Sequence, residues 1–227
     1  MCFLMILSSF SFFGYAINGI RSGLAGSLFI MGLYFFNAFK NSNVLCCMFM
    51  LMAYFTHKSM LLPIGMFLVS IFLVKDIKQA LILWVISIPI SLLFGGPIAN
   101  LLASMGIFDD RLEGYLFGEI HHGFRWDFLL YSIVPICFAY YLRIKKQIID
   151  KNYTLLVNTY MLSNAIWIIV INASFSNRFA YLSWFLYPLA MAYPLFNFKI
   201  WKKQDIGVAL TSFLYFFFTF FMWIIGK

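Results

Sequence analysis

Long apolar stretches fill most of the chain, and each is bounded by charge, Gly, Pro or Asn. They cover residues 2–17, 22–39, 44–56, 59–74, 79–94, 127–142, 153–171, 179–196 and 206–226. A helix needs about 20 apolar residues to cross the hydrocarbon core of a bilayer. The pattern predicts an all-α fold, a polytopic transmembrane helical bundle of about 7–9 membrane segments that forms a single transmembrane domain over residues 1–227.

The composition excludes a water-soluble domain. Hydrophobic residues make up 63% of the chain and charged residues 11%, whereas soluble domains contain about 45–50% apolar and about 25% charged residues. The net charge of +8 comes mainly from short clusters of Lys and Arg between the apolar stretches. Such clusters are topology signals, so we expect the lipid bilayer, and no nucleic acid, as a partner.

The basic clusters also predict which connections face the cytoplasm. They are Lys40, residues 75–78, residues 143–151 and residues 199–203, and Lys and Arg are in excess in cytoplasmic loops. Alternate crossings then place residues 18–21, 57–58, 95–126 and 172–178 on the extracytoplasmic side.

Two consecutive stretches, 44–56 and 59–74, are short for complete crossings. At 1.5 Å per residue they measure roughly 20 and 24 Å, against a hydrocarbon core of about 30 Å. His57 and Lys58, which lie between them, should therefore sit below the outer surface. Polar groups at that depth are tolerated where they line a water-filled cavity, so we expect a polar pocket there.

The long connection, residues 95–126, should form one larger extracytoplasmic loop. Gly95-Gly96-Pro97 at its start is typical of a helix end. Aromatic residues are interleaved with its charges and favour helices that lie on the membrane interface. Its ionisable residues are Asp109, Asp110, Arg111, Glu113, Glu119, His121, His122 and Arg125.

Several short motifs resemble those of a known family. They are Asn18-Gly-Ile-Arg21, Ala53-Tyr-Phe-Thr-His57-Lys58-Ser59, Phe124-Arg125-Trp126-Asp127-Phe128, and Ser176-Asn177-Arg178-Phe179-Ala180 with Trp184. Together they resemble EpsG-like, Wzy-type polysaccharide (O-antigen) polymerases.

This resemblance implies a function and a location. It implies polymerisation of oligosaccharide repeat units carried on undecaprenyl diphosphate, at the periplasmic face of the bacterial inner membrane. A chain-length regulator is then an expected partner. Relatives usually have several more spans before the Asn-x-x-Arg motif, which implies that this sequence is shortened at its N-terminus.

Transfer of a glycan from a lipid diphosphate needs cations to stabilise the leaving group, and arginine suits phosphate oxygens. A base should also accept the proton of the attacking hydroxyl, and His57 or a carboxylate could do so. His57 could equally donate a hydrogen bond to the diphosphate. The catalytic candidates are His57, Arg21, Arg178, Arg125 and Asp127, and the substrate-binding candidates are Asn18, Lys58, Asn177, Asp109, Glu113 and His121.

Structural roles for the same residues stay open. Arg21 and Arg178 could extend from span ends to the interface, Arg125 beside Trp126 could be an interfacial anchor, and His57 could be a structural residue. We expect no metal site, because the adjacent His121 and His122 would point in different directions on a helix, and we expect no cofactor. The alternative functions are a transporter or flippase of lipid-linked saccharide and a membrane acyltransferase that modifies surface glycans.

Overall fold

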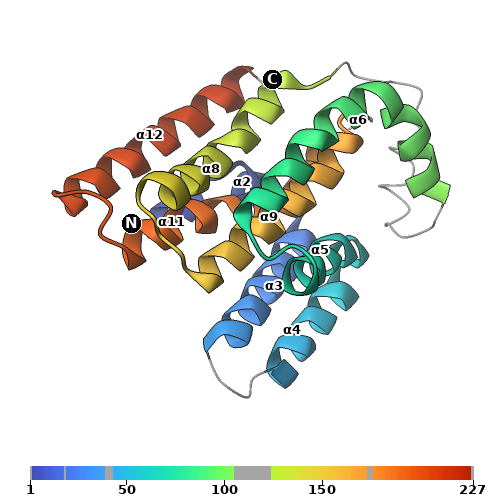
Figure 1. Cartoon of the computed structure of the whole chain (residues 1–227). Helices are drawn as coiled ribbons and strands as arrows, with labels where there is room; N and C mark the ends of the chain where they lie inside the picture. The colour runs from blue at the N-terminus through green and yellow to red at the C-terminus, as the bar shows by residue number, and fades with distance from the viewer. Residues whose placement is uncertain (1, 18, 39–42, 105–123, 173–175, 226–227) are drawn as a thin grey trace.

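The computed structural model describes residues 2–17, 19–38, 43–104, 124–172 and 176–225, and the regular structure within these ranges is helical. Figure 1 shows the helices packed side by side in one bundle. The elements are α1 (Cys2–Leu7), α2 (Phe10–Ile17), α3 (Ile20–Ala38), α4 (Asn43–Thr56), the 3₁₀ helix η1 (Lys58–Met60), α5 (Leu61–Phe72), α6 (Ile77–Ser104), α8 (Trp126–Lys145), α9 (Lys151–Ile169), α10 (Ser176–Trp184), α11 (Tyr187–Asn197) and α12 (Gln204–Ile225).

Helix α9 is the centre of the bundle. It contacts α5, α6, α8, α10 and α11, and every residue from 156 to 165 is buried. Most other helices leave one face exposed, and α12, for example, exposes Phe213, Phe217 and Phe220. An exposed stripe of this kind suits contact with lipid chains, whereas α9 is enclosed by protein on all sides.

Among the residues that the structure describes, four segments are long and apolar enough to cross a membrane, namely Ile77–Ile98, Trp126–Lys145, Arg178–Asn197 and Gln204–Ile224. Shorter apolar helices cover Ile20–Phe36, Asn43–Thr56 and Lys58–Phe72. The chain is therefore an all-helical protein with the features of a membrane protein. The expected total of 7–9 membrane segments stays a prediction.

Contacts between helices show that the helix ends lie together in two groups, one at each end of the bundle. At one end Arg143 of α8 pairs with Asp76 before α6, with 3.3 Å between Nη2 and Oδ2. At the same end Tyr193 of α11 donates to Asp150 before α9, at 3.1 Å. We call this the lysine end, because it carries Lys75, Lys78, Arg143, Lys145, Lys146, Lys151, Lys199, Lys202 and Lys203.

The opposite end holds the start of α3, the junction of α4 and α5, and the starts of α8 and α10. We call it the arginine end and define it by Arg21, His57, Arg125 and Arg178. Sequence-based topology places these same two groups on opposite sides of the membrane. Which side of a membrane each end faces stays a prediction.

The predicted start of the long loop at residue 95 is wrong. Helix α6 continues through Gly95, Gly96 and Pro97 to Ser104. The absent side chain of Gly95 lets α6 approach the end of α9, because a Cβ there would lie 3.0 Å from the backbone oxygen of Ile169. The interfacial helices expected farther along fall mostly on residues 105–123, outside the described residues.

Two predicted stretches are broken rather than continuous. Residues 2–17 form α1 and α2, separated at Ser9, whose hydroxyl accepts a hydrogen bond from the backbone N–H of Phe12 at 3.2 Å. Residues 179–196 divide into α10 and α11, and Pro188 lies in the first turn of α11, where proline is well tolerated.

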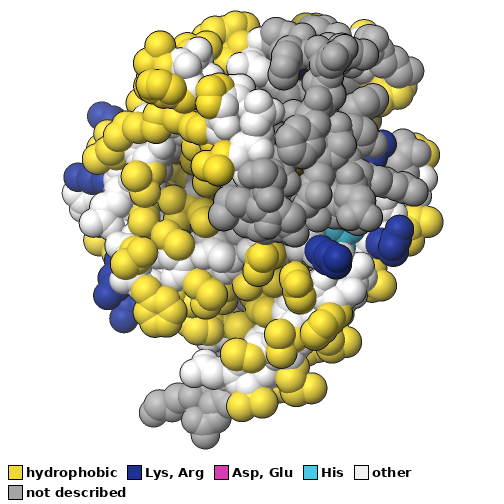
Figure 2. All heavy atoms as spheres, turned by 90° about the vertical axis from the view of Figure 1, so that its right-hand side faces the viewer, with side chains coloured by type: hydrophobic (Ala, Val, Ile, Leu, Met, Phe, Trp, Pro, Cys, Tyr) yellow, Lys and Arg dark blue, Asp and Glu magenta, His cyan; other side chains and the backbone are white. Residues whose placement is uncertain are grey.

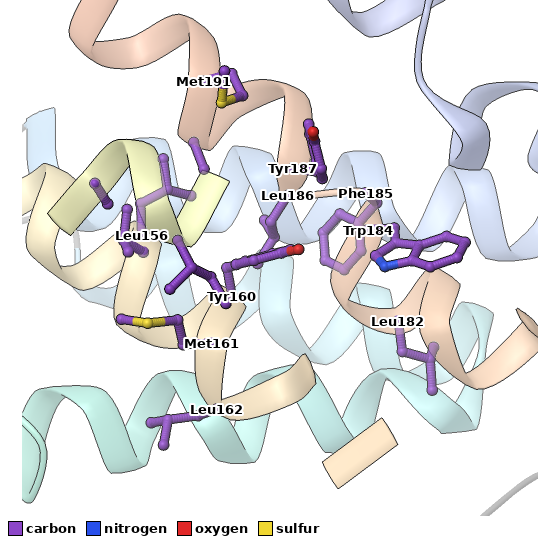
Figure 3. Close-up of a cluster of buried hydrophobic side chains, with 14 of the residues drawn as sticks. Leu156, Tyr160, Met161, Leu162, Leu182, Trp184, Phe185, Leu186, Tyr187 and Met191 are labelled. Atoms are coloured by element: carbon purple, nitrogen blue, oxygen red, sulfur yellow. The ribbon is translucent and has the colours of Figure 1, made fainter. Parts of the chain in front are cut away.

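The break between α10 and α11 is packed with large side chains. Figure 3 shows Trp184 and Tyr187 on either side of it, with Tyr160 of α9 nearby. Tyr131 of α8 stacks on Tyr187, with ring centroids 4.6 Å apart, and meets Trp184 edge-on at 4.9 Å. These rings hold α8, α9, α10 and α11 together below the arginine end.

Candidate functional site

Arg178 lies in the first turn of α10 and its side chain is exposed. The next two residues, Phe179 and Ala180, are buried, so α10 packs one face into the bundle and presents Arg178 outside it. Farther down the helix the indole Nε1 of Trp184 donates to Ser132 of α8 at 2.8 Å. Arg178 is therefore carried by a helix whose other end is fixed in the core.

Tyr15 connects the helix that carries Arg178 to the helix that carries Arg21. Its hydroxyl donates to the backbone oxygen of Tyr181, three residues after Arg178, at 2.8 Å. Its side chain also lies against Gly23, two residues after Arg21, where an added Cβ would be 3.0 Å from the Cβ of Tyr15. The starts of α3 and α10 are thus held against the same side chain, and both arginines lie at one end of the bundle.

His57 lies at the same end of the bundle as Arg21. Helices α3 and α4 pack as an antiparallel pair, in which Phe35 stacks on Phe49 at 5.3 Å and Gly32 faces Met50. Because α3 begins where α4 ends, Arg21 and His57 lie at the same end of this antiparallel pair. Figure 2 shows a histidine side chain beside Lys and Arg side chains on one face of the molecule.

The ring of His57 caps the short helix η1. Its Nδ1 accepts a hydrogen bond from the backbone N–H of Ser59 at 3.3 Å, and the residue has an extended backbone with φ −152° and ψ 110°. When Nδ1 accepts, the neutral ring carries its proton on Nε2. In this geometry His57 is a hydrogen-bond donor through Nε2 rather than a proton acceptor.

Arg125 and Asp127 form a closed pair at the start of α8. Nε of Arg125 donates to Oδ1 of Asp127 at 2.9 Å, and Nη2 donates to Oδ2 at 2.6 Å. The guanidinium also lies 3.8 Å from the centre of the Phe128 ring. Both carboxylate oxygens of Asp127 are engaged, so this pair orients the start of α8 and leaves less of either group for a substrate.

A groove of about 400 Å³ is lined by Tyr15 and by Ile20, the residue before Arg21. It runs along α3 past Ile20, Gly23 and Ser27 to Phe185 and Pro188 at the break between α10 and α11. Small residues on α3 leave the space open, and most of the lining is apolar. A long hydrocarbon chain fits a groove of this chemistry.

A buried polar network lies below these residues and was not anticipated from the sequence. The amide of Asn164 accepts from Nε1 of Trp84 at 2.8 Å and donates to the hydroxyls of Ser132 at 3.1 Å and Ser183 at 3.0 Å. It joins α6, α8, α9 and α10. The signal in the sequence was the group of polar residues within stretch 153–171, namely Asn158, Thr159, Ser163 and Asn164.

The other predicted residues divide into two sets. Lys58 is exposed in η1 next to His57, and Asn177 lies in the first turn of α10. Asn18, Asp109, Glu113 and His121 lie outside the described residues. Within the described ranges no group of three or more His, Cys, Asp or Glu side chains is arranged to hold a metal ion.

Comparison with known proteins gives a match at the level of the family. The family model of the EpsG family matches residues 1–227. No curated protein and no solved structure matches the chain.

Proposed function

Because the chain belongs to the EpsG family, we propose that it polymerises lipid-linked oligosaccharide repeat units into a longer polysaccharide. Family membership and the apolar helices fit a role in exopolysaccharide biosynthesis at a membrane. The finer proposal is a glycosyl transfer on undecaprenyl-diphosphate-linked units, carried out by a multi-pass protein at the periplasmic face of the bacterial inner membrane.

The observation that supports this proposal best is that Arg21 and Arg178 lie at the same end of the bundle. The two arginines come from opposite ends of the sequence, and contacts of Tyr15 with Gly23 and Tyr181 hold their helices together. Two guanidinium groups at one end of an apolar bundle match the charge of a lipid diphosphate at the membrane surface.

The reaction forms one bond and breaks another. A hydroxyl of the acceptor glycan attacks the anomeric carbon of the donor unit, and the bond from that carbon to the diphosphate oxygen breaks. The electron pair leaves with the diphosphate, and the hydroxyl proton passes to a base. Negative charge grows on the leaving group, so preorganised cations lower the barrier.

The candidate residues that the structure describes then have separate roles in this transfer. Arg21 and Arg178 bind the diphosphate oxygens. His57 donates from Nε2 to the same group, in keeping with the hydrogen bond that its Nδ1 accepts from Ser59. The closed pair of Arg125 and Asp127 positions α8.

The groove along α3 supports a lipid-linked substrate. Tyr15 and Ile20, the residue before Arg21, line it, and its lining is mostly apolar. A polyprenyl chain seated there would place its diphosphate at the arginine end. This arrangement keeps the hydrocarbon away from water and the charged group at the surface.

The test is complementation in the source bacterium after deletion of the chromosomal gene. We expect the wild-type chain to restore a ladder of long glycans on a gel, and Arg21→Ala, Arg178→Ala and His57→Ala to leave mostly single repeat units. The control is Lys202→Ala, which removes a cation from the lysine end and should keep the ladder.

Membrane levels of each variant are measured by immunoblot, so that loss of activity is separated from loss of protein. Long glycans made by Arg21→Ala and Arg178→Ala at normal membrane levels would overturn the assignment of the site. Single repeat units from a well-expressed wild-type chain would overturn the proposed function.

A further inference from the structure

A second groove, at the lysine end, is lined by charged residues. It encloses about 360 Å³ between the end of α5, the start of α6, the end of α8 and the first turns of α9. Lys75, Asp76, Arg143 and Lys151 all line it. Three segments of the chain, namely the connection before α6, the end of α8 and the start of α9, therefore contribute charge to one cavity.

The charges in this groove do not balance. Asp76 is paired with Arg143 at 3.3 Å, and it also accepts a hydrogen bond from the backbone N–H of Lys78 at 2.9 Å. Lys75 and Lys151 are exposed, and neither has a carboxylate within 4.0 Å among the described residues. The lining has a net charge of two positive units, which favours an anionic ligand.

The carboxylate nearest to Lys151 in sequence is already engaged. Asp150 accepts from the backbone N–H of Tyr153 at 2.7 Å and from the hydroxyl of Tyr193 at 3.1 Å. It does not line the groove. Asp150 therefore caps α9 and leaves the cation of Lys151 available to a ligand.

Asn158 gives a second, independent indication of a ligand. It lines the groove and is 0% exposed. Its Nδ2 donates to the backbone oxygen of Val74 at 2.8 Å, but its Oδ1 is buried without a hydrogen-bond partner. A buried acceptor left unpaired costs about 1–3 kcal/mol, so a donor from a bound molecule would stabilise this side chain.

The remaining lining is mostly apolar and continues into a neighbouring groove. Phe36, Ile71 and Leu155 line the charged groove. Leu155 also lines the adjoining groove of about 470 Å³, together with Leu33 and Phe196. A cationic groove that joins an apolar one matches a molecule with a phosphate at one end and a hydrocarbon chain at the other.

We propose that this groove binds one anionic phospholipid with a hydroxyl-bearing headgroup. Its phosphate lies between Lys75 and Lys151, a headgroup hydroxyl donates to Oδ1 of Asn158, and an acyl chain passes Leu155 into the adjoining groove. Basic pockets between membrane helices bind anionic lipid headgroups in this manner. The inference is independent of the proposed polymerase function, because it concerns the opposite end of the bundle.

The experiment measures lipids retained by the purified full chain with native mass spectrometry. The protein in detergent is mixed with equal amounts of dioleoyl phosphatidylglycerol and dioleoyl phosphatidylcholine. We expect wild type to retain one phosphatidylglycerol with about a tenfold preference, and the double variant K75A/K151A to lose that preference. The matched control K202A/K203A removes two cations from the same end, outside the groove, and should keep it.

Two further arms of the experiment test whether the lipid binds in this groove and whether the phosphate that binds belongs to a lipid rather than to free phosphate. Thr154→Trp fills the groove without changing its charge and should also abolish the preference. Inorganic phosphate in millimolar excess should not displace the lipid. Displacement by phosphate, equal loss in both double variants, or absence of a preference in wild type would each overturn the proposal.

Discussion

The hydroxyl of Tyr15 donates to the backbone oxygen of Tyr181 at 2.8 Å, and their rings meet edge to face with centroids 5.8 Å apart. This contact joins the second helix of the chain to the helix that carries Arg178. It is the link that holds two candidate diphosphate-binding arginines at one end of the bundle.

Tyr15→Phe removes this hydrogen bond and leaves the ring contact. We expect it to destabilise the protein by about 1 kcal/mol and to shorten the glycans made in the complementation assay, because the starts of α3 and α10 are less firmly joined. Thermal unfolding in detergent, followed by tryptophan fluorescence, measures the first effect. Tyr140→Phe, at an exposed position of α8, is the control, and equal melting temperatures for the two variants would contradict the prediction.

Asn164→Leu should be more damaging than Tyr15→Phe. Leucine has the same number of heavy side-chain atoms and the same branching at Cγ, but it leaves Nε1 of Trp84 without its acceptor, which lies at 2.8 Å, and removes both bonds to Ser132 and Ser183. We expect a loss of about 1–3 kcal/mol, typical of an unsatisfied buried donor.

The comparison is Asn197→Leu, at an exposed position where the amide donates only to the backbone oxygen of Tyr193. It should change the melting temperature little. Two equally stable variants would show that the network around Asn164 contributes nothing to stability.

The sequence predicts the helical class and the positions of most helices, because apolar stretches between charges have few alternatives in a membrane. It also predicts which ends lie together, since the cations of the lysine end cluster in alternate connections. The grouping of Arg21, His57 and Arg178 at the other end follows from the same alternation.

The interior of the bundle is harder to read from the sequence. Gly95-Gly96-Pro97 would end a helix in water, but in α6 the missing Cβ of Gly95 allows close contact with α9, and that tertiary contact outweighs local preference. Protein surrounds helix α9, and only the polar residues within stretch 153–171 distinguish it from the other apolar stretches. The pairing of Arg125 with Asp127 was not predicted either. The opposite charges that make these two residues candidates for catalysis also allow them to form an ion pair with each other.

Asp76 makes the stability of the lysine end depend on pH. Its pKa is lowered, chiefly by the hydrogen bond from the backbone N–H of Lys78 and also by Arg143, although partial burial opposes this. A carboxylate with a lowered pKa stabilises the fold above the unfolded pKa of about 3.9, and this stability is lost as the pH falls through the folded pKa.

We therefore expect Asp76→Asn to melt at a lower temperature than wild type at pH 7. The difference should shrink as the pH falls below about 4, because the wild-type carboxyl is then also neutral. Melting curves in detergent between pH 7 and pH 3 measure it. A difference that stays constant over this range would show that the charge of Asp76 is not the cause.

Gly14 and Gly65 both lie inside helices, but replacing each with alanine should have opposite effects. A Cβ on Gly14 would lie 2.7 Å from Cε2 of Tyr181. The Tyr181 ring, against which α2 packs, would therefore have to move. We expect Gly14→Ala to destabilise the protein by about 1–3 kcal/mol, the usual range for overpacking.

At Gly65 a Cβ meets nothing within 4 Å. Alanine there only reduces the freedom of the unfolded chain and should stabilise the protein by about 0.5–1 kcal/mol. Because the chemical change is identical, the two melting temperatures separate close packing from helix propensity. If both variants melt at a higher temperature than wild type, helix propensity dominates, and the close contact of α2 with Tyr181 does not hold the arginine end together.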